Sequence, residues 1–145
     1  MHDIAPLHYK IHLEPDLERF RFSGSTEIEM EIPEPLDHIV LNILELAVRR
    51  ARVQLDGKWE GCPFSVHPER EELVLDLPRK MTGKAALRID YEGQINDKMA
   101  GFYRSGYAKG GETKYIAVTQ FEKSDARRAF PCFEKTKKKA TFDIE

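Results

Sequence analysis

The stretch FRFSGSTEIEMEI, residues 20–32, decides the fold because its apolar side chains recur at every second position. The even-numbered positions carry the apolar residues Phe20, Phe22, Ile28, Met30 and Ile32, with Gly24 and Thr26 between them. A period of two is the repeat of a β-strand with one buried face, whereas a helix repeats at three and four. We therefore predict a strand that ends at Pro33, since proline has no backbone N–H to donate. Gly24 in its middle predicts a bend or a bulge.

The same alternation recurs along the chain, beginning with Tyr9, Ile11 and Leu13, and Pro15 closes that run. Shorter strands are predicted at residues 39–41, 48–55, 73–77, 85–91, 115–120 and 141–144. The pairs at residues 56–57 (DG) and 110–111 (GG) predict tight hairpin turns, because these residues accept positive φ. Helical periodicity is nearly absent. The predicted fold class is antiparallel all-β.

Length and composition indicate one soluble domain over residues 1–145. The chain has 145 residues, 41% of them apolar, with 23 Lys and Arg against 25 Asp and Glu. A net charge of −2 argues against a nucleic-acid or anionic-membrane partner. No run approaches the roughly 20 apolar residues of a membrane span. No signal peptide is predicted, and Cys62 and Cys132 are expected to be reduced thiols in the cytoplasm, with one bridge between them left open.

The last residues, TFDIE at 141–145, begin a strand of the right alternation that stops without a turn or a partner. We therefore expect the domain to be truncated at its C-terminal end. An unpaired final strand promotes association, so Phe142 and Ile144 are expected to be sheltered by a neighbouring strand or by a second copy. Self-association through this strand is the corresponding expectation.

Most catalytic and metal motifs are absent from the sequence. There is no glycine-rich phosphate loop, nucleophile elbow or Cys-x-x-Cys. His8 and His12 have the spacing of a helical zinc pair, but on a strand they lie about 13 Å apart, too far to share one zinc ion. Cys132 has no neighbouring histidine to activate it. The lysine-rich run at 135–139 is typical of a solvated turn. No metal site is predicted in this chain.

Gln120 and Glu122 are the candidate binding residues. Two positions apart on a strand, their side chains would project to the same side about 6.6 Å apart. An amide beside a carboxylate can hold an ammonium group and a neighbouring peptide group together. The same spacing is common on solvent-exposed strands, so it does not decide between a binding site and an ordinary surface.

Several segments resemble the zinc aminopeptidases of the aminopeptidase N family. The strongest is TQFEKSDARRAFPCF at residues 119–133, followed by KATF at 139–142. MAGFYRS at 99–105, PLHY at 6–9 and FSG at 22–24 also match, in order. The resemblance covers nearly the whole chain without large gaps.

This resemblance implies a saddle-like β-sandwich, the amino-terminal domain that packs against a thermolysin-like catalytic domain and closes one side of its cleft. It implies that Glu122 binds the substrate's α-ammonium group and that Gln120 lines the pocket for the first side chain. Asp125, Arg127 and Arg128 are expected to hold their loop by paired hydrogen bonds.

Two departures from the family pattern matter. Residues 134–137 read EKTK where the family usually has D-E-P-A, which removes a stiffening proline. H-E-x-x-H, G-A-M-E-N and the catalytic tyrosine are absent from these residues, so zinc is implied only for the parent enzyme and the chain alone is predicted to be inactive.

The predicted function is a non-catalytic domain of a zinc aminopeptidase acting on peptide amino termini. The alternative is a non-enzymatic protein-interaction domain on the same fold. A complete metalloenzyme would need ligands that the sequence lacks.

Overall fold

The computed structural model describes residues 4–97, 100–121, 125–133 and 139–145. Within these ranges it contains nine strands and two short 3₁₀ helices. The strands are β1 (Ala5–Asp16), β2 (Arg21–Asn42), β3 (Leu46–Leu55), β4 (Lys58–Gly61), β5 (Phe64–His67), β6 (Glu72–Gln94), β7 (Gly101–Lys109), β8 (Glu112–Gln120) and β9 (Thr141–Ile144). The 3₁₀ helices are η1 (Pro68–Arg70) and η2 (Asp125–Arg128). The all-β prediction is confirmed.

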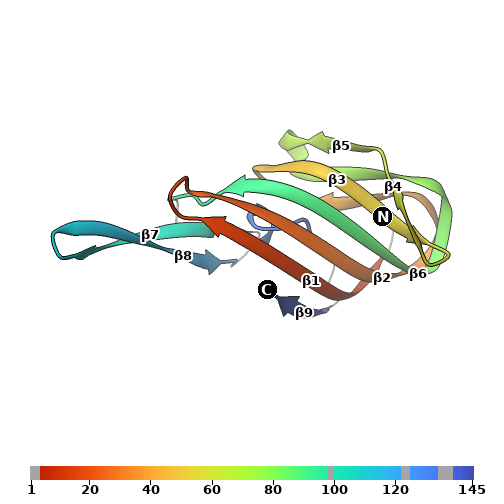
Figure 1. The fold of residues 1–145 in the computed structure, drawn as a ribbon. Helices are drawn as coiled ribbons and strands as arrows, with labels where there is room; N and C mark the ends of the chain where they lie inside the picture. Colours follow the sequence, from red (N-terminus) through yellow and green to blue (C-terminus); the bar gives the residue numbers. More distant parts are fainter. Residues whose placement is uncertain (1–3, 98–99, 122–124, 134–138) are drawn as a thin grey trace.

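Seven strands form one sheet in the order β4-β3-β6-β2-β1-β9, with β5 paired to β6. The remaining two strands, β7 and β8, form a separate hairpin that projects from the body of the domain (Figure 1). Every pair of neighbouring strands in these two sheets is antiparallel except β1 and β9, which run parallel to each other. The predicted purely antiparallel sheet is therefore corrected to a mixed one. Parallel pairing is available to β9 because a long connection, rather than a tight turn, brings it to β1.

The two longest strands continue through their predicted ends. β2 passes Pro33 and reaches Asn42, with register shifts against β6 between Ile32 and Leu36 and again after Leu36. The irregular pairing at this bend leaves no ladder position that needs the missing proline N–H. Gly83, with φ +81°, lies opposite Ile32 on β6. Residues 21–32 and 39–41 thus belong to one bent strand, β2, and residues 73–77 and 85–91 belong to another, β6. Phe20 lies in the preceding turn, with φ +52°.

The bend gives the domain its sandwich character, since both arms of the bent strands contribute to one core. Ile28 and Leu87 of one arm, and Leu41 and Leu73 of the other, are fully buried in the same cluster. Gly24 marks neither a bend nor a bulge, because the β2–β6 register is unbroken there. The glycine instead makes room for the ring of Tyr91.

The terminal strand finds the partner predicted for it, but its side chains stay exposed. β9 pairs with β1 in the register Tyr9 to Phe142. Phe142 and Ile144 are nevertheless 51% and 68% exposed. The expectation that both are sheltered was wrong, because pairing through the backbone covers the strand's edge and leaves its faces open. Phe142 retains contacts on one side, a stack on Tyr9 at 4.9 Å and an edge-to-face contact with Phe130 at 6.5 Å between ring centroids.

The remaining local predictions agree with the structure in part. Both predicted turns are present, with positive φ at Asp56, Gly57, Gly110 and Gly111. Strands β4, β5 and β7 were missed, because short or glycine-rich runs show little alternation. Both cysteines are buried free thiols, and burial raises the pKa of the Cys62 thiol. In the part of the chain that the structure describes, no helix has the length and apolar character needed to cross a membrane.

Candidate functional site

The candidate site lies where the projecting hairpin joins the body of the domain. Gln120 is the last residue of β8 and pairs with Gly101, the first residue of β7. Its side chain is exposed, whereas the following Phe121 is half-buried. Glu122 lies outside the described residues, so its same-side relation to Gln120 stays a prediction. The structure therefore places one of the two candidate residues.

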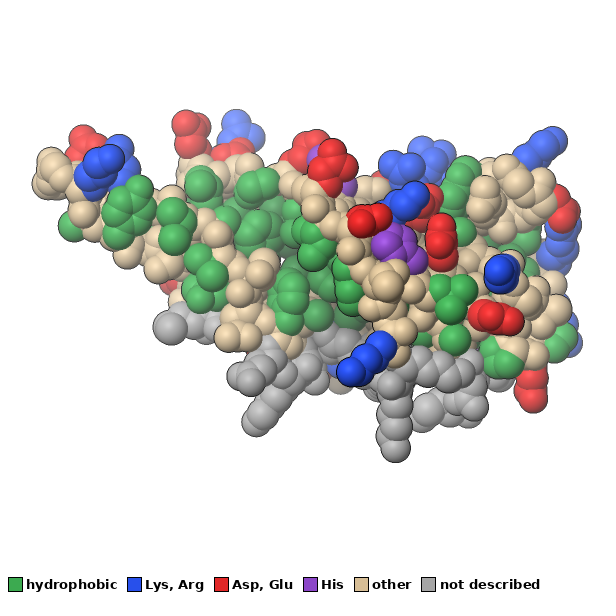
Figure 2. All heavy atoms as spheres, turned by 90° about the horizontal axis from the view of Figure 1, so that it is seen from below, with side chains coloured by type: hydrophobic (Ala, Val, Ile, Leu, Met, Phe, Trp, Pro, Cys, Tyr) green, Lys and Arg blue, Asp and Glu red, His purple; other side chains and the backbone are tan. Residues whose placement is uncertain are grey.

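The hairpin itself presents an apolar surface. Tyr107, Tyr115 and Ile116 are 47%, 40% and 50% exposed. Figure 2 shows hydrophobic side chains continuing from the hairpin onto the adjoining part of the body. A two-stranded hairpin is marginal on its own in water, so its stability depends on contacts with the body. One of these is Tyr115, midway along the hairpin, against Phe20, with ring centroids 4.8 Å apart.

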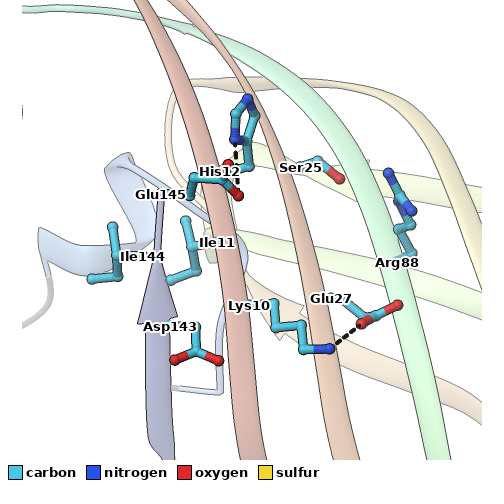
Figure 3. Close-up of a pocket in the computed structure, with 9 residues that line it drawn as sticks. All are labelled: Lys10, Ile11, His12, Ser25, Glu27, Arg88, Asp143, Ile144 and Glu145. Carbon is cyan, nitrogen blue, oxygen red and sulfur yellow. Dashed lines mark ion pairs between the residues drawn. The ribbon is translucent and has the colours of Figure 1, made fainter.

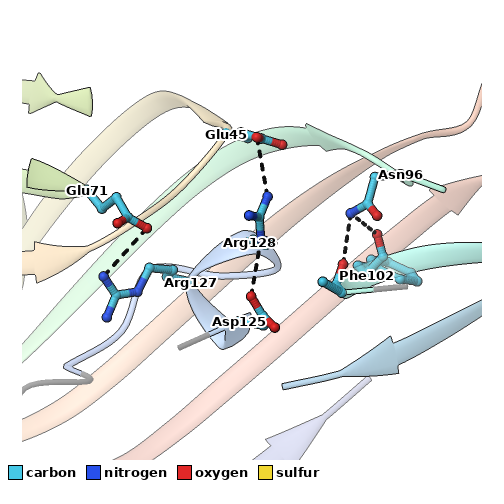
Figure 4. Close-up of polar contacts among 8 residues, drawn as sticks. Glu45, Glu71, Asn96, Phe102, Asp125, Arg127 and Arg128 are labelled. Carbon is cyan, nitrogen blue, oxygen red and sulfur yellow. Dashed lines mark hydrogen bonds and ion pairs between the residues drawn. The ribbon is translucent and has the colours of Figure 1, made fainter. Parts of the chain in front are cut away.

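The base of β7 is held by buried aromatic and polar contacts. Phe102 packs on Phe22 with ring centroids 5.0 Å apart. The Asn96 side-chain amide donates to the carbonyls of Ala100 (2.9 Å) and Phe102 (3.2 Å) (Figure 4). Arg104 donates to the Ile95 carbonyl at 2.9 Å. The motif at residues 99–105 drew attention to this loop, but no sequence pattern pointed to Asn96, whose role depends on a turn formed only in the fold.

The segment after the hairpin is tied to the β2–β3 loop by backbone hydrogen bonds. The Asn42 N–H donates to the Cys132 carbonyl at 2.7 Å, and Cys132 N–H donates back to Asn42 at 3.1 Å. Leu44 N–H donates to the Arg127 carbonyl at 2.9 Å. Cys132 is 4% exposed and lies in this core, as expected for a packed thiol rather than a nucleophile.

Two arginines of η2 add charged contacts to this frame. Arg127 is buried, with Nη1 3.8 Å from the carboxylate of Glu71. Arg128 lies between two carboxylates: Nε donates to Asp125 at 3.3 Å, and Nη1 is 3.3 Å from Glu45 (Figure 4). Asp125, Arg127 and Arg128 were expected to hold their loop by paired hydrogen bonds. The contact of Arg128 with Asp125 is a hydrogen bond, whereas those of Arg127 with Glu71 and of Arg128 with Glu45 are ion pairs.

Aromatic rings complete the frame beneath the site. Phe121 meets Phe130 edge to face at 5.7 Å between centroids, and Phe130 meets Tyr9 at 6.0 Å. The Tyr9 hydroxyl accepts a hydrogen bond from the Phe133 N–H at 3.0 Å. Phe121 is therefore fixed directly after Gln120. The EKTK turn at 134–137 lies outside the described residues.

The histidines of β1 lie beside carboxylates. His8 is 3.0 Å from Asp143, and His12 is 2.9 Å from Glu14 and 3.7 Å from Glu145. His12 lines a groove of about 520 Å³ on the outer face of β1, β2, β6 and β9, where Figure 3 shows its pairing with Glu145. In the described ranges, no three His, Cys, Asp or Glu side chains are grouped to bind a metal ion.

Comparison with known proteins defines the class of this domain. The peptidase M1 N-terminal domain matches residues 5–145. The chain is 42% identical over 141 residues to aminopeptidase M1-D of Oryza sativa subsp. japonica, covering 97% of this chain and 16% of that protein. It is 39% identical over 149 residues to mitochondrial aminopeptidase 2 of Saccharomyces cerevisiae, covering 98% of this chain and 15% of that protein. It is 41% identical over 146 residues to aminopeptidase M1 of Arabidopsis thaliana, covering 97% of this chain and 17% of that protein.

The all-β body with its projecting hairpin is thus a peptidase M1 N-terminal domain, since the matching family model spans residues 5–145. The chain belongs to the peptidase M1 family, as its N-terminal domain. It spans between 15% and 17% of the length of these three relatives.

Proposed function

We propose that this chain is the non-catalytic amino-terminal domain of a zinc-dependent aminopeptidase that removes residues from peptide amino termini. The family match over residues 5–145 is the observation that carries the proposal. The described residues lack a grouped metal ligand set, so zinc would be held by the catalytic domain of the same polypeptide. The zinc ion would supply the activated water there. The 145 residues alone would not hydrolyse peptides.

In this proposal the domain closes one side of the active-site cleft and binds the substrate's amino end. The Glu122 carboxylate would accept charge-assisted hydrogen bonds from the α-ammonium group. Gln120 would line the pocket of the first side chain. Binding the amino terminus places the first peptide bond at the reacting centre, so that one residue is released at a time. The fixed position of Gln120 at the hairpin base supports this role.

The exposed apolar hairpin supports the second part of the proposal, packing against a catalytic domain. Tyr107, Tyr115 and Ile116 are aromatic or branched side chains, and such residues gain stability when a partner surface covers them. We also propose a cytoplasmic location, which the buried free thiols Cys62 and Cys132 support.

A chimera tests the function. This chain replaces the matching N-terminal segment of the Oryza sativa relative, and kcat/KM is measured with aminoacyl-p-nitroanilides. The chimera is expected to be active. Glu122→Ala should lower kcat/KM by about 10-fold to 100-fold, because one charge-assisted hydrogen bond is worth about 1.5–3 kcal/mol. Glu29→Ala, an exposed carboxylate on β2, is the matched control and should leave the rate unchanged.

The alternative is a protein-interaction domain without a role in hydrolysis, suggested by the altered sequence at residues 134–137. A chimera that folds and assembles yet has no activity would favour it. Unchanged kinetics in Glu122→Ala, in an active chimera, would reject the amino-end role while leaving the domain assignment in place.

A further inference from the structure

Arg128 joins the base of the hairpin to the body of the domain. Its side chain lies directly against Gly101, where a Cβ would approach the Arg128 Cβ to 2.5 Å and its Cδ to 3.0 Å. Gly101 has φ +70°, a conformation that favours glycine. Gly101 is also the cross-strand partner of Gln120. Arg128 therefore touches the residue that holds Gln120 in register.

The guanidinium of Arg128 lies between two carboxylates, with a hydrogen bond to one and an ion pair with the other. Nε donates to Asp125 within η2, and Nη1 faces Glu45 of the β2–β3 loop, each at 3.3 Å. The side chain is 21% exposed, so solvent screens these pairs less than it does at an open surface. Glu45 itself has φ +59°, in the left-handed region, and the neighbouring Leu44 N–H is bonded to the Arg127 carbonyl. The loop that carries Glu45 is thus held in place independently of Arg128.

The hairpin is also attached to the body through β7. On the opposite strand, Phe102 packs on Phe22, and the Arg104 guanidinium lies 4.1 Å from the centroid of the Phe20 ring. Both contacts fix β7 from its own side. The contact between Arg128 and Gly101 approaches the hairpin from η2, on the side of the chain that follows Gln120.

We propose that Arg128 is a positioning residue that sets where Gln120 stands, and so the preference for the first residue of the substrate. This inference rests on the proposed function. The hydrogen bond to Asp125 and the ion pair with Glu45 point in two directions. The planar guanidinium suits this arrangement, because its separate nitrogens can face both carboxylates at once. A lysine supplies one point charge on a flexible stem, so it would keep the charge and lose the fixed orientation.

The first test uses the 145-residue chain and amide hydrogen exchange. Arg128→Ala and Arg128→Lys should each speed exchange at Gly101 and Gln120, relative to the strand centres of β2 and β6. Arg49→Ala is the matched control, since Arg49 pairs with Glu92 at 2.8 Å on the outer face. Exchange at Gly101 and Gln120 that matches the wild-type chain in both Arg128 variants would overturn the proposal.

The second test measures specificity in the chimeric aminopeptidase. The readout is the ratio of kcat/KM for leucyl- and alanyl-p-nitroanilide, which a uniform loss of stability would not change. Arg128→Ala should shift this ratio in the same direction as Gln120→Ala, by about fivefold to tenfold, because small misplacements of a binding group are costly. Arg128→Lys should recover little of the shift, and Arg49→Ala should show none.

A double-mutant cycle separates positioning from a structural effect. In the Gln120→Ala background, Arg128→Ala should shift the ratio no further, because its action passes through Gln120. An equal shift in both backgrounds would overturn the proposal.

If Arg128→Ala does not fold, Glu45→Gln serves as a milder variant that weakens the ion pair with Arg128 and should shift the ratio in the same direction. If Gln120→Ala leaves the ratio unchanged, the proposed pocket role fails, and the exchange experiment still decides whether Arg128 holds the hairpin base.

Discussion

Gly24 and Tyr91 face each other across β2 and β6, and the Tyr91 ring occupies the space that a side chain at residue 24 would fill. A Cβ on Gly24 would lie 2.5 Å from Cε2 of that ring. The Tyr91 hydroxyl lies 2.7 Å from the Thr26 hydroxyl, two residues along β2. Tyr91 is 1% exposed, so its ring is held within the packed core. The glycine is explained by this close approach.

Gly24→Ala should therefore destabilise the domain. Overpacking a rigid core position costs about 1–3 kcal/mol, and we expect a loss of this size in the free energy of unfolding measured in urea. Gly61→Ala is the control, because nothing lies within 4 Å of a Cβ there and its φ is not positive. The control should change stability by less than about 0.5 kcal/mol. Equal effects of the two substitutions would contradict the packing explanation.

The hydroxyl pair of Thr26 and Tyr91 should behave as a coupled unit. Thr26→Val or Tyr91→Phe alone leaves one buried hydroxyl without this partner, at a cost of about 1–3 kcal/mol each. The double variant removes both groups and should cost less than the sum of the two single variants. Urea unfolding of the four proteins gives the coupling. Strict additivity would mean that each hydroxyl has another partner.

Protonation of His12 should respond most to Glu14. The hydrogen bond to Glu14 is the main cause that raises the pKa of His12 above its usual 6.5, and the charge of Glu145 adds to it. Glu14→Gln should lower this pKa more than Glu145→Gln does, as measured by NMR titration of the imidazole. The raised pKa means that the His12 contribution to stability is complete below pH 6.5. It is lost as the pH rises through the folded-state pKa. A larger effect of Glu145→Gln would contradict this ordering.

The two apolar residues of β9 should differ in their effect on stability. Phe142→Ala removes the stack on Tyr9 and should cost about 1 kcal/mol, within the range measured for aromatic pairs. Ile144 is 68% exposed, so Ile144→Ala should change the free energy of unfolding by less than about 0.5 kcal/mol. Thermal or urea unfolding of both variants checks the difference. Similar losses would indicate that Ile144 is covered in solution, for example by a second copy.

The candidate site was predictable only in part. The alternation of residues 115–120 predicted a strand that ends at Gln120, where the structure also has it. The contact of Arg128 with Gly101 and Glu45 was not predictable, because both residues are remote from Arg128 in sequence and meet it only after β2, β6 and β7 have assembled.

The sequence by itself determined that residues 21–32 and 85–91 form strands with one buried face, because alternation along a strand is a local property of the backbone. It did not determine that β2 continues past Pro33 or that β9 lies parallel to β1. Those features depend on which strand covers which, and hence on long-range packing that no local period encodes. The tertiary structure also decided why residue 24 is glycine, since the need for it comes from the ring of Tyr91 on another strand.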